Sequence, residues 1–168
     1  MTIRAARPDE VERLIGIETA AGRLFADHGY PALAAAAPAT PEQYRATLQG
    51  RRVLVAADGG DHAVGFALTE QLGPVEWLCE LSVDPAHGRR GIGGMLLEEV
   101  VLSARRRGCE RAALSTFRAV PFNAPFYARH GFAAVEPAAA DPTLGERFHA
   151  EVPAGIDPEE RVLMIRIL

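Results

Sequence analysis

One glycine-rich stretch has the composition of an anion-binding turn. "GRRGIGGMLLEEV", residues 88–100, places glycines and two arginines at the start of a segment with helical periodicity. The first amides of a helix have no acceptor within it, and the helix dipole makes that end positive. Glycine lets the backbone approach an anion closely, and Arg89 and Arg90 add charge-assisted donors. The stretch therefore predicts a phosphate or diphosphate site.

Two familiar phosphate-binding loops do not match this stretch. A Walker A loop ends in Gly-Lys-Ser/Thr, whereas this turn ends in Gly-Gly-Met. A dinucleotide fingerprint requires glycine or alanine at Leu96 and follows the first strand of its βαβ unit. An ordinary glycine-rich connection with solvated arginines remains the alternative at this point.

A second stretch, "STFRAVPFNAPFYARHGF", contains an amide and a phenol with helical spacing. Asn123 and Tyr127 are four residues apart, which predicts that they lie on one face of a helix. A phenol can donate a proton to a departing anion. The alternative for Tyr127 is a core aromatic that carries its hydroxyl at the surface.

The strand "VEWLCELSV", residues 75–83, supplies a candidate proton acceptor. Alternation places Glu80 on one face with Leu78 and Ser82. Partial desolvation there would raise the pKa of the carboxyl and make it a stronger base. A primary ammonium, with a pKa of about 10.4, must lose a proton before it attacks an electrophile. A salt-bridged strand residue is the alternative for Glu80, and Glu76 is a weaker rival near the start of the strand.

With these motifs together, the chain resembles the GNAT superfamily of acyl-CoA-dependent N-acyltransferases. "RRGIGGMLL" after "ELSVDPAH" is similar to the family's signature turn, Gln/Arg-x-x-Gly-x-Gly/Ala. Gly91 and Gly93 fill the two glycine places. Gly88 departs from the pattern, and either Arg89 or Arg90 would replace the missing side chain unless backbone donors suffice. The resemblance runs from residue 4 to residue 168 and is strongest over residues 75–132.

The resemblance implies a role for each site residue. It implies that Glu80 accepts the proton of the amine and that Asn123 contacts pantetheine. It also implies that Tyr127 protonates the leaving thiolate. A backbone amide near Leu81 or Ser82 would stabilise the tetrahedral oxyanion. The donor-binding backbone comprises Leu81, Ser82 and Val83 along pantetheine, and Arg89, Arg90, Gly91, Ile92, Gly93 and Gly94 around the pyrophosphate.

Periodicity and turn signals place these residues in an α/β chain. The predicted strands are 2–7, 51–58, 63–72, 75–83, 111–116, 131–136 and 161–168, and the predicted helices are 8–27, 41–50, 93–107 and 121–130, with a short one near residue 141. "YPALAAAAPA", residues 30–39, is expected to be a loop. We expect residues 1–168 to form a single GNAT-like domain, with a mixed central sheet, splayed parallel strands and flanking helices.

Bulk composition excludes several classes of protein. The 168 residues include 48% hydrophobic residues and carry a net charge of −4, which favours one globular domain and does not favour nucleic-acid binding. The N-terminus has no apolar signal core, and no apolar run is long enough for a membrane span. Two cysteines without a C-x-x-C motif fit a reduced cytoplasmic setting. The five histidines lack metal-ligand spacing, so we expect no metal.

The leading hypothesis is direct transfer of an acetyl group from acetyl-CoA to a small-molecule amine in a ternary complex. A non-catalytic CoA-binding sensor, a longer acyl donor and a protein amine acceptor are the alternatives. Acceptor contacts are expected from the first two helices and from residues 137–158. The apolar final strand "RVLMIRIL" would suit pairing in a homodimer if it lay at a sheet edge.

Overall fold

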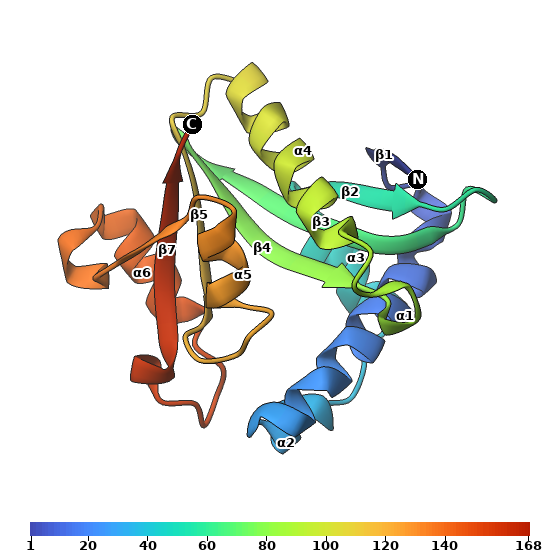
Figure 1. Cartoon of the computed structure of the whole chain (residues 1–168), viewed down its shortest axis with the longest axis horizontal. Coiled ribbons are helices and arrows are strands. Elements are labelled where there is room, and N and C mark those ends of the chain that lie inside the picture. The colour runs from blue at the N-terminus through green and yellow to red at the C-terminus, as the bar shows by residue number, and fades with distance from the viewer. The chain divides into compact units, whose positions relative to one another are not determined.

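The computed structural model describes residues 1–168 and contains seven strands and several helices, coloured along the chain in Figure 1. The residues fall into two compact units. The first unit contains Met1–Glu70 and Glu80–Ser103, and the second contains Gln71–Cys79 and Ala104–Leu168. The strands are β1 (Thr2–Ala5), β2 (Arg52–Ala57), β3 (Ala63–Leu72), β4 (Val75–Val83), β5 (Arg111–Phe117), β6 (Ala133–Val135) and β7 (Arg161–Ile167). Strand β4 passes from the second unit into the first.

The seven strands follow the hydrogen-bonded order β1-β2-β3-β4-β5-β7-β6. Strands β4 and β5 are parallel, with Val75 opposite Arg111, whereas β1–β2, β2–β3, β5–β7 and β6–β7 are antiparallel. The mixed sheet predicted from the sequence is thus confirmed. Strand β7 pairs on both sides, with β5 and β6, so the premise that it is a bare edge strand was wrong.

Helices of the first unit follow the local signals closely. The α-helices are α1 (Val11–Gly22), α2 (Pro31–Ala34), α3 (Pro41–Leu48) and α4 (Ile92–Arg106), and the residues of α4 after Ser103 belong to the second unit. Short 3-10 turns, η1 (Pro8–Glu10) and η2 (Arg23–His28), extend α1 to nearly the predicted length. A capping box begins α3, where the Thr40 hydroxyl accepts from the Gln43 amide and the Gln43 side chain accepts from the Thr40 amide.

The expected loop at residues 30–39 was partly wrong, because α2 forms one helical turn there. Pro31 occupies its first position, where the absent amide proton is not needed. The alanines that looked like loop residues are also the best helix formers, and this favours a turn of helix.

The second unit has an apolar core between its strands and α6 (Pro142–Ala150). Its other elements are α5 (Ala124–Arg129) and the 3-10 turns η4 (Pro137–Ala139) and η5 (Pro158–Glu160). The buried core side chains are Val75, Trp77, Ala113, Leu144, Phe148 and Leu163. None of the helices in the chain is both long enough and apolar enough to cross a membrane.

Candidate functional site

The connection from β4 to α4 forms a hydrogen-bonded turn at its start. Asp84 caps the 3-10 turn η3 (Pro85–His87), because its Oδ1 accepts from the Ala86 amide at 3.0 Å. The Gly88 amide then donates to the Pro85 carbonyl at 3.1 Å. A Cβ at Gly88 would lie 3.2 Å from the same oxygen, so a side chain at the first place of the motif would require the Pro85 carbonyl to move by a few tenths of an ångström.

The remainder of the turn is exposed and has an unusual backbone. Arg89 and Gly91 have φ values of +60° and +77°, a region that glycine enters without strain. The Met95 amide bonds back to the Gly91 carbonyl at 3.0 Å, which makes Gly91 the cap of α4. The amides of the first helical turn, from Ile92 onward, therefore have no acceptor within the helix. Both the exposed amides and the adjacent arginines suit an anion.

Helix α4 buries one face. The buried side chains are Ile92, Leu96, Leu97, Val100, Val101 and Ala104. Met95, in contrast, is 41% exposed. Leu96 and Leu97, both fully buried, already occupy that turn of the apolar face, so the helix rotates Met95 to its border.

Glu80 is held by a neighbour on its own strand. The Ser82 hydroxyl donates to Glu80 Oε1 at 2.6 Å, as expected for residues on one face of β4. Ser82 is buried, whereas Glu80 is half-buried. The bond orients the Glu80 carboxylate along the face of β4 that it shares with Ser82.

A tyrosine that sequence reasoning missed belongs to the same unit. The Tyr44 hydroxyl on α3 donates to Glu18 Oε2 on α1 at 2.6 Å. Burial raises the pKa of Tyr44 most, followed by the hydrogen bond to Glu18 and by the negative charges of Glu18 and Glu80. Tyr44 therefore remains a neutral donor. Its signal in the sequence was weak, namely one aromatic residue in the otherwise polar helix that the Thr40 cap begins.

The rival carboxylate, Glu76, has a different environment in the second unit. It is 1% exposed, and its Oε2 lies 2.5 Å from the Arg107 guanidinium. The Cys109 thiol is 4.0 Å from the same oxygen. A carboxylate that is sequestered and paired in this way cannot meet an incoming amine, so Glu76 has a structural role.

Asn123 and Tyr127 also lie in the second unit, and one expectation about them was wrong. Helix α5 begins at Ala124, and Asn123 is its cap with φ −113° and ψ −113°, so the two do not share a helix face. The Asn123 carbonyl accepts from the Tyr127 amide at 3.0 Å. The Tyr127 ring is 8% exposed and packs edge-on against Phe126 and Phe132, with ring centroids 5.1 and 5.9 Å away. Packing thus fixes the ring in place.

The two cysteines, Cys79 and Cys109, are not joined in a disulfide. Cys79 is half-buried, with Arg147 of α6 at 3.6 Å from its sulfur. Arg147 also binds Glu151, which accepts from the Trp77 indole at 2.9 Å. These contacts fix α6 against the first half of β4.

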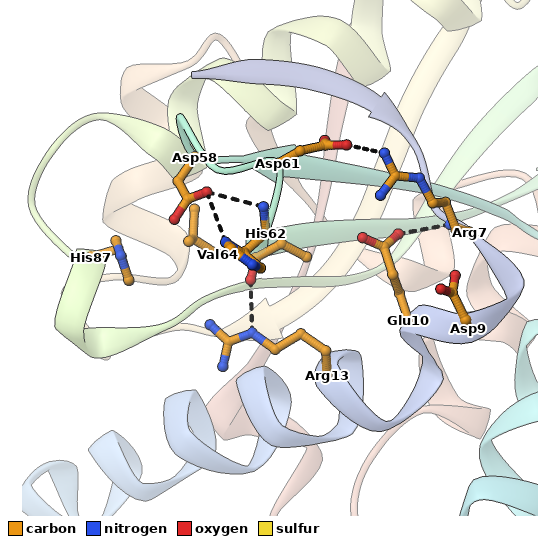
Figure 2. A pocket seen from close by; sticks show the side chains of 10 residues that line it. Arg7, Asp9, Glu10, Arg13, Asp58, Asp61, His62, Val64 and His87 are labelled. Atoms are coloured by element: carbon orange, nitrogen blue, oxygen red, sulfur yellow. Dashed lines mark hydrogen bonds and ion pairs between the residues drawn. The ribbon is translucent and has the colours of Figure 1, made fainter.

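A charged hollow of about 520 Å³ lies beside the N-terminal end of α1 (Figure 2). Ion pairs occupy much of its wall, since Asp61 binds Arg7 and the Glu10 carboxylate accepts from the Arg7 amide at 2.7 Å. Arg7 lowers the pKa of Asp61, and Arg4 lowers the pKa of Glu10. Arg13 and His87 complete the wall on the side of the turn before α4. Its charges are mostly satisfied by one another.

Comparison with known proteins defines the class to which this fold and this turn belong. A family profile described as an acetyltransferase (GNAT) domain matches residues 49–134, which is 86 of the 168 residues. The chain therefore belongs to the GNAT acetyltransferase family and is an acyltransferase. The match extends from before β2 into β6 and so contains the turn, Glu80 and α5.

Solved structures with the same fold extend over nearly the whole chain. A GCN5-related N-acetyltransferase from Rhodopseudomonas palustris is 24% identical, with a TM-score of 0.72 over 99% of this chain and 95% of that chain. The ribosomal-protein-S18-alanine N-acetyltransferase of Escherichia coli is 17% identical, with a TM-score of 0.70 over 99% and 92%. The PaiA N-acetyltransferase of Thermoplasma acidophilum, solved with coenzyme A, is 15% identical, with a TM-score of 0.66 over both full chains.

Proposed function

We propose that this chain transfers the acetyl group of acetyl-CoA to the amine of a small molecule. The observation that carries the proposal is the exposed turn from Arg89 to the start of α4, with two left-handed residues and a helix N-terminus. A diphosphate is the anion that suits several convergent amides and flanking guanidinium groups. The solved relative from Thermoplasma acidophilum contains coenzyme A, a ligand with that group.

The backbone supplies most of the proposed donor contacts. The amides from Arg89 to Gly94 would hold the pyrophosphate, and Arg89 and Arg90 would add side-chain charge. The strand from Leu81 to Val83 would bond to the amides of pantetheine as a neighbouring strand does. Asn123 is proposed to contact pantetheine as well, on the strength of its place in the family motif.

The proposed chemistry is direct attack within a ternary complex. The acceptor arrives as an ammonium and gives one proton to Glu80, directly or through water. Its nitrogen then forms a bond to the thioester carbon, and an amide near Leu81 or Ser82 stabilises the oxyanion. The carbon–sulfur bond breaks, and the thiolate takes a proton from Tyr127. The attacking nitrogen releases its second proton through water to the Tyr127 phenolate, so the product is a neutral amide and the tyrosine is restored. Glu80 and Tyr127 are the proposed acid–base pair.

The charges around Tyr44 support a cationic small-molecule acceptor. Glu18 binds the Tyr44 hydroxyl, and Glu80 is near enough for its charge to act on Tyr44. Two carboxylates from α1 and β4 thus favour a positively charged amine over a neutral one. The relative from Escherichia coli is named for a protein alanine acceptor, so a protein amine is the second candidate.

We further propose that residues 1–168 act as one domain in the cytoplasm. The single hydrogen-bonded order of seven strands supports one domain. Two cysteines that form no disulfide fit a reducing compartment, in which disulfides do not persist.

Calorimetric titration with acetyl-CoA tests the donor, and release of thiol from acetyl-CoA across a panel of amines tests the transfer. Binding without release for every amine would favour the sensor alternative. Release of thiol only from acyl-CoA donors longer than acetyl-CoA would show that the transferred group is a longer acyl group. Absence of binding would overturn the proposal.

Two glycine variants make the binding test specific. Gly91 and Gly155 have φ values of +77° and +82°, and at both positions the space that a Cβ would enter is open to 4 Å. Valine should therefore strain both positions similarly. Only Gly91→Val should weaken acetyl-CoA binding, by about tenfold or more, because only Gly91 lies in the turn. Equal weakening by both variants would contradict the assignment of this turn.

A further inference from the structure

Arg13 on α1 makes two contacts that reach the turn before α4. Its Nε donates to the Ala63 carbonyl at 2.7 Å, and its terminal nitrogen donates to Asp84 Oδ2 at 2.7 Å. Figure 2 shows the guanidinium rising from α1 toward the backbone beside His62 and Val64. One side chain thus ties α1 to the first residue of β3 and to the residue that follows β4.

Asp84 in turn anchors the start of the turn by three other bonds. Its amide donates to the Val64 carbonyl at 2.9 Å, its Oδ1 accepts from Ala86, and its carbonyl accepts from His87 at 2.8 Å. The first of these bonds joins the turn to β3, and the other two shape η3. The Arg13 hydrogen bond lowers the pKa of Asp84 more than any other contact, so the pair stays ionised at neutral pH.

We propose that Arg13, acting through Asp84, is a positioning residue that holds the pyrophosphate-binding turn ready for the donor. The inference rests on the proposed function, because it assigns the geometry of the same turn to a residue of α1. Arg13 itself does not contact the reacting groups.

The energetics favour a geometric role over a stabilising one. The Arg13 side chain is 42% exposed, and a pair so open to solvent adds little to folding stability. The turn that it anchors contains Arg89 in the left-handed region, a conformation that surrounding contacts must maintain. Amides fixed before the donor arrives lose less entropy on binding, so the pair should affect donor affinity.

Four variants separate this role from simple stabilisation. Arg13→Gln and Asp84→Asn each break the ion pair, and asparagine still caps η3 because it is as good a helix cap as aspartate. Their double variant measures coupling. Arg51→Gln is the matched control, since Arg51 binds Glu70 at 3.1 Å in a similarly half-exposed pair of the first unit.

Calorimetry with CoA should show about a five- to tenfold weaker affinity for each single variant and no further loss for the double variant. The kcat at saturating acetyl-CoA should stay close to wild type. With S-acetylpantetheine, which lacks the pyrophosphate, kcat/KM should be unchanged. The control should match wild type throughout.

Three results would overturn the proposal. The first is an unchanged CoA affinity in Arg13→Gln. The second is a fall in kcat/KM with S-acetylpantetheine as large as the fall with acetyl-CoA. The third is a loss of CoA affinity in the double variant that equals the sum of the losses in the two single variants. If the wild-type chain itself does not bind CoA, the proposed function fails, and the role of Arg13 fails with it. Wild-type binding with an unaffected Arg13→Gln variant removes this inference alone.

Discussion

Two glutamates on strand β4, Glu76 and Glu80, are four residues apart and have opposite surroundings. Glu76 is 1% exposed and is paired with Arg107 in the second unit. Glu80 is half-buried in the first unit, where it accepts from the neutral Ser82 hydroxyl. A buried carboxylate needs a countercharge, and a carboxylate paired in this way does not act as a base. A carboxylate held by a hydroxyl can still accept a proton.

The same contrast separates the polar groups of the two units more widely. In the second unit, Arg147 and Glu151 bind each other and Trp77, and they fix α6. In the first unit, Arg89 and Arg90 are exposed beside a helix N-terminus. The partner of a charged side chain thus indicates its role better than its residue type does.

The largest effect should come from Glu76→Gln. It leaves Arg107 without its countercharge beside the core, which should lower the free energy of unfolding by about 3 kcal/mol. Urea unfolding followed by circular dichroism measures the loss. Glu80→Gln is the matched variant on the same strand and should change stability by less than about 1 kcal/mol. Equal losses of unfolding free energy in the two variants would contradict the different roles assigned to Glu76 and Glu80.

The second-largest effect should be the loss of activity in Glu80→Gln. Removing the proton acceptor should lower kcat/KM by about 10²- to 10³-fold. The rise of rate with pH on the acidic side should also flatten, because that rise follows deprotonation of Glu80. Full activity with an unchanged pH profile would show that Glu80 does not accept the proton.

Tyr127→Phe tests whether the second unit contributes chemistry as well as structure. Phenylalanine keeps the edge-on packing against Phe126 and Phe132 and removes only the hydroxyl. We expect kcat to fall by about 10²-fold while acetyl-CoA affinity stays close to unchanged. Steady-state kinetics measures kcat, and calorimetry measures the affinity for acetyl-CoA. Unaltered turnover would leave Tyr127 as a core residue.

The smallest effect should come from Ser82→Ala. Loss of the donor to Glu80 Oε1 makes the carboxylate easier to protonate, so the acidic limb of the pH–rate profile should move to higher pH by less than about one unit. The maximum rate should be largely retained. A shift to lower pH would contradict the bond's proposed role.

Much of the local structure followed from the sequence. Periodicity and turn signals predicted α3, the glycine-rich turn predicted the start of α4, and alternation placed Glu80 beside Ser82. These features depend on residues within a few positions of one another, so short-range rules suffice. The same rules failed at Asn123, where the helix begins one residue later than the four-residue spacing implied.

The sequence by itself determined the family, the strands and most of the helices, and the stretch that binds an anion in our proposal. Only the tertiary structure decided which partner each charged group received. Glu76 is paired with Arg107, and Tyr44 is hydrogen-bonded to Glu18. Arg13 is paired with Asp84, which is 71 positions away in the sequence. Such partners are chosen when elements distant in sequence pack together, because burial selects among charges that look equivalent along the chain.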